Sequence, residues 1–293
     1  YERMKDCSPC YPVIFPAMSY AKRELESPAI STAVLHQVER LSSDSSPASA
    51  CGVVGIGAVG DAIVEDLLKR DRKVVITDID DRVLSKFRDR KNVEVVGSIV
   101  DIVLREDVEL VFGCTGSDIS KAFVNAMRFI RGKKIFCSCS SGNGEWLTLL
   151  KLIQERSEKP LNPLMDISFA TDQARLLVVN GGHPINHDRE PWNVPAKDIA
   201  LTQGLMFGAI VDAMTRYVDP KTPLFIMLDP LIQRSVVDSW KKDQPSGRYS
   251  EDLWEQFSHL ATIRKRSSGE YHMNPFIEEW FRGDKKTLLH KLR

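Results

Sequence analysis

The sequence has no surplus of either charge, because 40 Lys and Arg residues are balanced by 40 Asp and Glu residues. A protein that binds nucleic acid through its phosphates needs a basic surplus, so we expect no nucleic-acid partner. The sequence also lacks a run of about 18 uncharged apolar residues, the length that a membrane-spanning helix requires, so we expect no membrane partner. What remains is an ordinary globular mixture of 293 residues, 43% hydrophobic and 27% charged. Such a chain can bury a sizeable core.

Cysteine is too sparse for a disulfide framework, with six residues in the whole chain. Cys51, Cys114 and Cys137 lie in apolar runs that are typical of buried strands, where a thiol behaves as a small hydrophobic group. This usage predicts a reducing, cytoplasmic location. Cys7 and Cys10 have the C-x-x-C spacing of zinc or redox sites, but no second such pair lies nearby. We predict a loop without metal there, with a metal site as the weaker alternative.

Short apolar runs alternate with helical patterns after a polar linker at residues 42–49. The predicted strands are 51–55, 73–77, 93–96, 109–114, 134–139 and 175–180, and the predicted helices are 61–70, 82–90, 98–105, 117–130 and 145–156. This alternation predicts an α/β fold with a Rossmann-type, doubly wound parallel sheet.

The two ends of the chain have a different character. Residues 1–20 contain three prolines and predict irregular structure. Apolar spacing predicts a helix over 24–41, for which Ser27-Pro28 is the expected start. A long helix is predicted over 197–217, and mostly helical structure over 222–241 and 250–266.

A G-x-G-x-x-G motif follows the first predicted strand of the alternating region, at Gly55, Gly57 and Gly60, with Ala58 and Val59 inside it. The first glycine permits a tight turn, the second lets the backbone approach a pyrophosphate, and the third lets helix and strand pack closely. The helix that follows presents unpaired N–H groups to an anion. The motif therefore predicts a dinucleotide-binding site, with a turn kept only for packing as the alternative.

The second strand ends in Asp78, 21 residues after Gly57, where an acid that binds the cofactor ribose is expected. A carboxylate there accepts hydrogen bonds from ribose hydroxyls and repels a 2′-phosphate. We therefore predict NAD rather than NADP as the cofactor, with Asp78 and Ile79 among the residues that bind it. Arg82 lies close enough in sequence to soften that preference.

Three later turns also follow predicted strands and should face the same ligand, because parallel strands share one carboxyl edge. We predict cofactor contacts from Thr115, Gly116 and Ser138, with ordinary polar turns as the alternative. Asn180 follows the last strand and carries both a donor and an acceptor for a carboxamide. His183 comes after two glycines and is a candidate general acid or base.

The order of these motifs resembles the NAD-binding domain of S-adenosylhomocysteine hydrolases over about residues 24–215. The similar segments are residues 52–80, Thr115-Gly116, residues 135–137 and Val179-Asn180 through His183-Pro184. The family has Glu where Asp78 stands. The resemblance implies a tightly held NAD that oxidises a ribose 3′-hydroxyl, and homo-oligomers that are commonly tetramers. It also implies that Asp78 binds the adenosine ribose and that Asn180 and His183 lie near the nicotinamide.

The sequence departs from that family at its catalytic positions. Only about 50 residues precede the glycine motif, where the family has a large substrate domain. The family's Lys and Asp-Asn pair is missing from residues 15–23, and Lys22 is out of place for it. Ser141 stands where the family has a cofactor-site His, and the family's C-terminal tail is not recognisable. The cofactor half of the resemblance therefore carries over, and the hydrolase chemistry does not.

The layout of the family implies an NAD-binding domain at 46–199 and a smaller, mainly helical module formed by 1–45 and 200–293. A cleft between the two would hold a small-molecule substrate. The first functional hypothesis is an NAD-dependent oxidoreductase, or a hydrolase relative, that acts on a small substrate such as a nucleoside. Its candidate catalytic groups are His183, Lys22, His187 and Asp188.

The second hypothesis is a non-catalytic NAD-binding subunit or sensor that works through its helical region. Its candidate aromatic anchors are Trp240, Trp254, Trp280 and Phe281, with core packing as the alternative for each. Under either hypothesis we expect a homo-oligomer, a dimer or a tetramer.

Overall fold

The structure is a computed structural model that describes residues 13–41, 50–140, 144–157, 159–186, 196–215 and 225–244. Its described residues group into two compact units. One unit contains residues 30–186, and the other contains residues 13–29 and 196–244. None of the helices in these ranges is long and apolar enough to cross a membrane.

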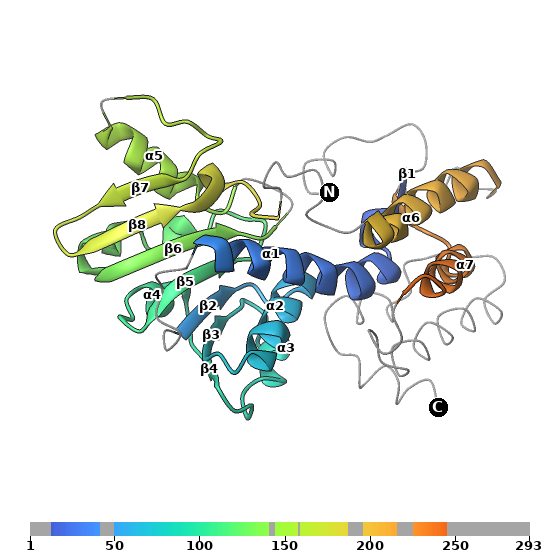
Figure 1. The fold of residues 1–293 in the computed structure, drawn as a ribbon, viewed down its shortest axis with the longest axis horizontal. Helices are drawn as coiled ribbons and strands as arrows, with labels where there is room; N and C mark the ends of the chain where they lie inside the picture. Colours follow the sequence, from blue (N-terminus) through green and yellow to red (C-terminus); the bar gives the residue numbers. More distant parts are fainter. Residues whose placement is uncertain are drawn as a thin grey trace. The chain divides into compact units, whose positions relative to one another are not determined.

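The larger unit is built on a seven-stranded sheet with the order β4-β3-β2-β5-β6-β8-β7 (Figure 1). The strands are β2 (Ala50–Val54), β3 (Val74–Thr77), β4 (Val93–Val95), β5 (Val108–Gly113), β6 (Gly132–Ser138), β7 (Ile167–Ala170) and β8 (Ala174–Val178). All neighbouring pairs are parallel except β7 with β8. The predicted α/β, Rossmann-type fold is therefore confirmed, and the antiparallel edge strand β7 is an addition that the sequence pattern did not show.

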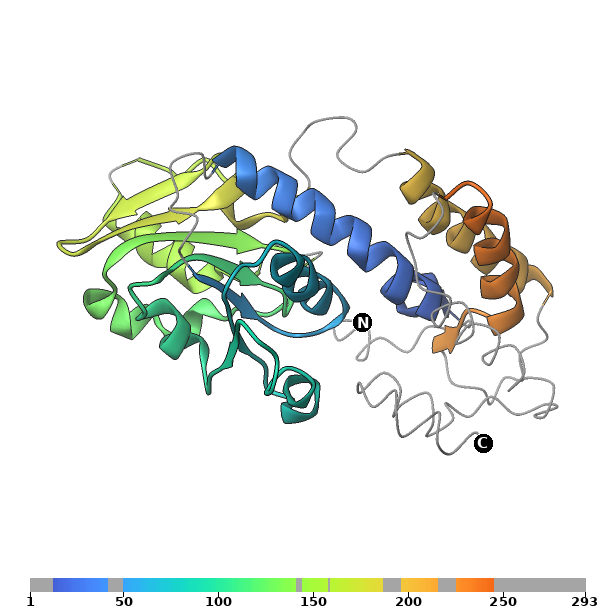
Figure 2. The ribbon, with the colours of Figure 1, turned by 60° about the horizontal axis from the view of Figure 1, so that its bottom comes forward.

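Helices cover both faces of this sheet (Figures 1 and 2). One face packs against α1 (Ser27–Leu41) from Ile30 onward and α2 (Ala58–Lys69), and the other against α4 (Ile99–Val103) and α5 (Leu147–Arg156). Alternate strand residues serve the two cores, so that Phe112 packs with α1 and α2 while Val111 packs on the opposite side. Burial on both faces explains why these strands are almost wholly apolar.

Residues 117–130 do not form the α-helix that their pattern predicts. They form two 3₁₀ segments, η4 (Ser120–Ala122) and η5 (Val124–Phe129). Contacts distant in the chain hold the segment, because the Ile119 N–H donates to the Glu145 carbonyl at 3.0 Å and the Asp118 carboxylate accepts from the Thr148 hydroxyl at 2.6 Å. These contacts override the helical preference of the sequence.

The expected helix start at Ser27-Pro28 lies inside a continuous helix. A π-helical segment, η3 (Lys22–Glu26), runs directly into α1, and Ser27 has helical backbone angles of φ −56° and ψ −38°. Pro28 cannot donate to a carbonyl one turn back and its ring crowds that carbonyl. A wider π turn at this point accommodates the proline inside a continuous helix.

The smaller unit contains a two-stranded parallel sheet and two packed helices. Its strands β1 (Val13–Phe15) and β9 (Phe225–Met227) pair in a region where the sequence predicted irregular or helical structure. The helices α6 (Ala196–Thr215) and α7 (Pro230–Lys241) enclose an apolar core. Trp240 belongs to that core and donates its indole N–H to the Lys197 carbonyl at 2.6 Å, so it is no surface anchor. Trp254, Trp280, Phe281 and residues 250–266 lie outside the described residues.

The division between the units differs from the predicted boundaries. Residues 30–45 were assigned to the helical module, but the described residues from Ile30 to Leu41 group with the sheet. The physical reason is burial, since Val34, Leu35 and Val38 are part of the sheet core. Alternating strands and helices marked the sheet domain, but they carried no information about where α1 would pack.

Candidate functional site

The carboxyl ends of β2, β3, β5 and β6 lie along one edge of the sheet, because these strands are parallel. Strand β2 lies beside both β3 and β5, so the chain order reverses between β2 and β5. Doubly wound sheets bind ligands at such a reversal, just beyond the strand ends. The glycine motif follows β2 at this position.

The three glycines of the motif differ sharply in their surroundings. Gly55 has a φ of +89°, which favours glycine, and a Cβ there would lie 2.7 Å from Thr115. A Cβ on Gly60 would lie 1.9 Å from the Gly55 carbonyl oxygen, so this position cannot hold a larger residue without a shift. Gly57 caps α2, and a Cβ there would meet no atom within 4 Å. Two glycines therefore shape the turn, and the third leaves open space at the start of α2.

Ala58 and Val59 form the first turn of α2 and are half-buried. No side chain caps this helix, because Gly57 is its N-cap and carries none. The N–H groups of the first turn lack partners within a helix, and their positive dipole end attracts an anion.

Asp78 joins β3 to the glycine turn. One carboxylate oxygen accepts the Ile56 N–H at 2.5 Å, and the other accepts the Asp80 N–H at 2.8 Å. Asp78 is half-buried, whereas the neighbouring Ile79 side chain is fully exposed. The predicted ribose acid thus lies against the predicted phosphate turn, and each of its oxygens keeps a lone pair for a further donor.

Thr115 and Gly116 form an exposed turn after β5 that is organised by a residue the sequence analysis missed. The Glu145 carboxylate is fully buried and accepts the N–H groups of Thr115 at 2.6 Å and Gly116 at 3.1 Å. Its other oxygen accepts the Ser138 hydroxyl at 2.8 Å. Glu145 therefore fixes the ends of β5 and β6 to each other.

Ser138 consequently does not offer its side chain to a ligand as predicted. It is fully buried, and its hydroxyl donates to Glu145. Ser140, two residues further on, is the better candidate, because its Oγ is buried and has no hydrogen-bond partner among the described residues. Ser140 lies beside the turn after β5, with its Cβ 4.0 Å from where a Cβ on Gly116 would be.

Asn180 and His183 follow β8 in a short turn, η6 (Val179–Gly182). Asn180 has a left-handed φ of 50°, its N–H donates to Asp166 at 2.8 Å, and its amide nitrogen lies 3.4 Å from the Pro184 carbonyl. The chain then returns to the end of β6, where the Ile185 N–H donates to the Ser138 carbonyl at 2.9 Å. His183 is half-buried in this return. The turn therefore belongs to the same edge as the β6 end.

The other candidate catalytic residues do not belong to the described part of the larger unit. Lys22 belongs to the smaller unit, where its amino group pairs with Glu26 and lies 3.3 Å from the Thr202 hydroxyl. Cys7, Cys10, Ser141, His187 and Asp188 lie outside the described residues.

The cysteines near the sheet core are poorly suited to reactive or metal-binding roles. Burial raises the pKa of the Cys51, Cys137 and Cys139 thiols, which keeps them protonated at neutral pH. Within the described ranges, no group of three or more His, Cys, Asp or Glu side chains is arranged to hold a metal ion.

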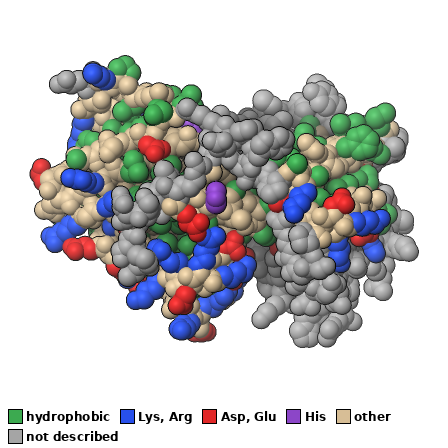
Figure 3. Space-filling view, viewed as in Figure 1, with side chains coloured by type: hydrophobic (Ala, Val, Ile, Leu, Met, Phe, Trp, Pro, Cys, Tyr) green, Lys and Arg blue, Asp and Glu red, His purple; other side chains and the backbone are tan. Residues whose placement is uncertain are grey.

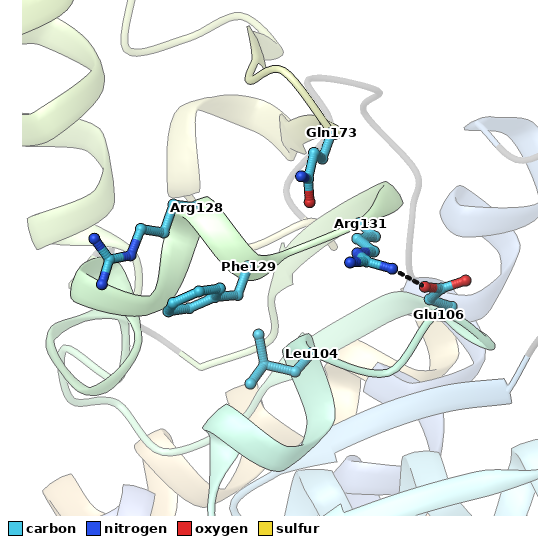
Figure 4. A pocket seen from close by; sticks show the side chains of 6 residues that line it. All are labelled: Leu104, Glu106, Arg128, Phe129, Arg131 and Gln173. Atoms are coloured by element: carbon cyan, nitrogen blue, oxygen red, sulfur yellow. Dashed lines mark hydrogen bonds and ion pairs between the residues drawn. The ribbon is translucent and has the colours of Figure 1, made fainter.

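A pocket of about 540 Å³ lies at the opposite, amino edge of the sheet (Figure 4). Its lining residues Glu106, Arg131 and Gln173 stand just before β5, β6 and β8. Glu106 and Arg131 form an ion pair of 3.4 Å, and Phe129 is 56% exposed. Because it is shallow and far along the strands from the glycine turn, it does not belong to the candidate site.

No protein-family model matches the chain, and no curated protein matches it either. Among solved structures the chain is similar to L-tryptophan dehydrogenase from Nostoc punctiforme, at 14% identity over 83% of this chain and 62% of that one, with a TM-score of 0.38. It is also similar to an L-alanine dehydrogenase, at 15% identity over 75% of this chain and 64% of that one, with a TM-score of 0.36. A third similar structure is a 2-hydroxyacid dehydrogenase from Ketogulonicigenium vulgare. The identity is 14% over 67% of this chain and 67% of that one, with a TM-score of 0.35.

The chain spans less than two thirds of the tryptophan and alanine dehydrogenases to which it is similar. Its own strand order and turn geometry, and not these distant likenesses, define its fold.

Proposed function

We propose that the carboxyl edge of the sheet binds NAD and that the protein is an NAD-dependent oxidoreductase or a relative of the S-adenosylhomocysteine hydrolases. The observation that carries the proposal is the open space at Gly57, between the crowded Gly55 and Gly60 and at the start of α2. The fold itself leaves room for a side chain at Gly57. A ligand that comes close to the backbone there would explain why the residue is a glycine. A pyrophosphate at the start of a helix is such a ligand.

Three further features of the edge fit a dinucleotide. The Asp78 carboxylate lies on the glycine turn, where it would accept hydrogen bonds from ribose hydroxyls. Ser140 provides a buried hydroxyl to which no other part of the described structure is hydrogen-bonded, and such a group suits a polar ligand. The exposed turn at Thr115 and Gly116 would cover the middle of the cofactor. Asn180 and Ile79 remain in the proposed site, whereas the Ser138 side chain does not.

NAD takes up a hydride from a carbon that bears a hydroxyl or amino group, and the proton of that group passes to a base. His183 is the proposed base, because it is half-buried in the return from β8 to the end of β6. The substrate class is a small molecule, and a nucleoside follows from the family resemblance. Lys22 is the weaker catalytic candidate, since Glu26 and Thr202 hold its amino group.

The second candidate function is a non-catalytic NAD-binding subunit. It is favoured by the missing Lys and Asp-Asn pair and by the position of Lys22 in an internal ion pair. The two functions differ in one measurable property. An oxidoreductase converts bound NAD to NADH when it is offered a substrate from a panel of nucleosides, hydroxy acids and amino acids, whereas a non-catalytic subunit does not. If the protein is an oxidoreductase, His183→Asn should abolish this conversion while nucleotide binding remains.

The binding proposal is tested by titrating the protein with NADH and following the fluorescence of the nucleotide. Gly57→Ala should fold normally, because its Cβ meets no atom and its φ of −72° suits alanine. It should weaken NADH binding at least about tenfold, since a methyl group would occupy the place of a phosphate. Gly97→Ala is the matched control, because a Cβ there makes only an ordinary contact of 3.6 Å with Asp101.

The thermal midpoints of both variants should match that of the parent protein. Equal NADH affinity in the parent and in Gly57→Ala would contradict the proposed phosphate site. Absence of NADH binding in the parent protein would overturn the proposed function as a whole.

A further inference from the structure

Arg82 is the cation nearest in sequence to the proposed ribose acid Asp78, and a neighbouring carboxylate holds it. Its Nε donates to one oxygen of Asp80 at 2.8 Å and its Nη2 donates to the other at 2.7 Å. This two-point contact is the arrangement in which a guanidinium binds a carboxylate or a phosphate most specifically. While it binds Asp80, this fork is not presented to a phosphate.

Asp80 is itself fixed in the turn after β3. Its N–H donates to Asp78 at 2.8 Å, and its carboxylate caps α3 (Asp81–Ser85) by accepting the Arg82 N–H at 3.1 Å. The same carboxylate therefore caps the helix and binds the guanidinium two residues later. Because the backbone of Asp80 is tied to Asp78, the Asp80–Arg82 pair lies next to the proposed ribose acid.

The other cations of residues 82–90 are also matched with acids. Lys86 pairs with Asp61, Arg88 with Asp81, and Arg90 with Glu65. Figure 3 shows blue and red side chains interspersed over the part of the surface that α3 and β4 occupy in Figure 1. Of these cations Arg82 is the nearest to Asp78 along the chain and lies in the first turn of α3, so it is the one that we expect a group on the adenosine ribose to meet.

We propose that Asp80 determines the cofactor specificity of the chain, by holding Arg82 so that the turn after β3 accepts a ribose 2′-hydroxyl and rejects a 2′-phosphate. This inference rests on the proposed NAD site and deepens it. Asp78 alone repels a phosphate through its charge. Asp80 adds a second acid and binds the Arg82 guanidinium at the start of α3, and so removes the attraction that would offset that repulsion. Asp80 is thus a positioning residue that acts through Arg82.

The test compares the affinities for NADH and NADPH in matched variants, each measured by nucleotide fluorescence. Asp80→Asn keeps a helix-capping side chain but removes the charge that binds Arg82. It should lower the ratio of the NADPH to the NADH dissociation constant about tenfold. The reason is that the Arg82 guanidinium could then form a hydrogen-bonded ion pair with the 2′-phosphate of NADPH. Adding Arg82→Gln to that variant should restore the parent ratio, and Arg82→Gln alone should change it by less than about twofold.

Asp81→Asn is the control for a general loss of negative charge, because Asp81 forms the neighbouring pair with Arg88. It should leave the ratio within about twofold of the parent value, and added salt should reduce the effect of Asp80→Asn. The inference is overturned if the ratio of the NADPH to the NADH dissociation constant is the same in Asp80→Asn and the parent. It is also overturned if Asp81→Asn lowers this ratio as much as Asp80→Asn does. In either case, NADH binding by the parent would still support the proposed site. If the parent protein binds neither nucleotide, it is the proposed function that fails.

Discussion

At the scale of single residues, Glu145 is the buried group on which the candidate site depends most. It contributes no atom to the exposed edge, yet it accepts hydrogen bonds from two backbone amides after β5 and from a hydroxyl at the end of β6. A buried carboxylate is tolerated only when its oxygens are satisfied in this way. The exposed turn at Thr115 and Gly116 is therefore held in place by a side chain that is buried beneath it.

Replacing Glu145 with Gln should lower the free energy of unfolding by about 1–3 kcal/mol. The amide keeps the shape but turns one acceptor into a donor that would oppose the Ser138 hydroxyl or the two N–H groups. Chemical denaturation measures the change, and Glu155→Gln on the exposed side of α5 is the control. Equal stability of Glu145→Gln and the parent would show that the three hydrogen bonds do not act together.

The contrast between Ser138 and Ser140 shows what a single sequence predicts about a site. The strand and the polar turn after it could be predicted, because an apolar run ends at Cys137 and small polar residues follow. Which of the two hydroxyls is held inside the protein could not, because that depends on the position of Glu145 beside the end of β6. Glu145 gave no signal, because its partners Thr115 and Gly116 lie about 30 residues away.

At the scale of elements, β6 enters the sheet with a lysine pointing inward. The Lys134 side chain is fully buried, and its amino group donates to the carbonyls of Arg105 at 2.6 Å and Val108 at 2.5 Å. It thereby connects the start of β6 to the loop before β5. Burial lowers the pKa of Lys134 below its usual value of 10.5, and Asp107 opposes this shift only in part.

Stability should therefore depend on pH through Lys134. Between its lowered pKa in the folded state and 10.5, the unfolded chain binds more protons, so this residue makes stability rise with pH in that window. Lys134→Met should lose that part of the rise. Urea unfolding at several pH values from neutral to about 10.5 measures the difference between variant and parent. Lys133→Met, which removes a half-exposed lysine paired with Glu109, is the control, and identical slopes in Lys134→Met and the parent would refute the assignment.

The elements that the sequence predicted well are those whose own pattern is long enough to define them. The strands β2, β3, β5 and β6 are mostly buried on both faces, and α2 has a buried stripe at helical spacing. Strands β1 and β9 have three residues each and pair across more than 200 residues, as in Val13 with Phe225. Their formation depends on which distant segment lies beside them, and no local pattern records that.

At the scale of the whole molecule, the smaller unit carries an apolar helix face that its own core does not cover. Met206, Phe207, Ile210 and Met214 on α6 are 57%, 68%, 59% and 81% exposed. Their spacing of three and four residues places them on one stripe of the helix, and Figure 3 shows hydrophobic side chains gathered where Figure 1 places α6. Contiguous apolar surface of this kind is typical of interaction sites. A homo-oligomer stays a prediction, and a contact between two copies of this stripe is the form of it that can be tested.

A symmetric contact between two α6 helices makes a definite prediction. Replacing Phe207 and Ile210 with Glu should convert the oligomer to a monomer, because four carboxylates would then meet without partners across a two-fold axis. Light scattering after size-exclusion chromatography measures the mass over a range of concentrations. Ser235→Glu adds one carboxylate at an exposed position of α7 and should leave the mass unchanged. A parent protein that is monomeric at every concentration, or a double variant that keeps the parent mass, would rule out this face as the contact between copies.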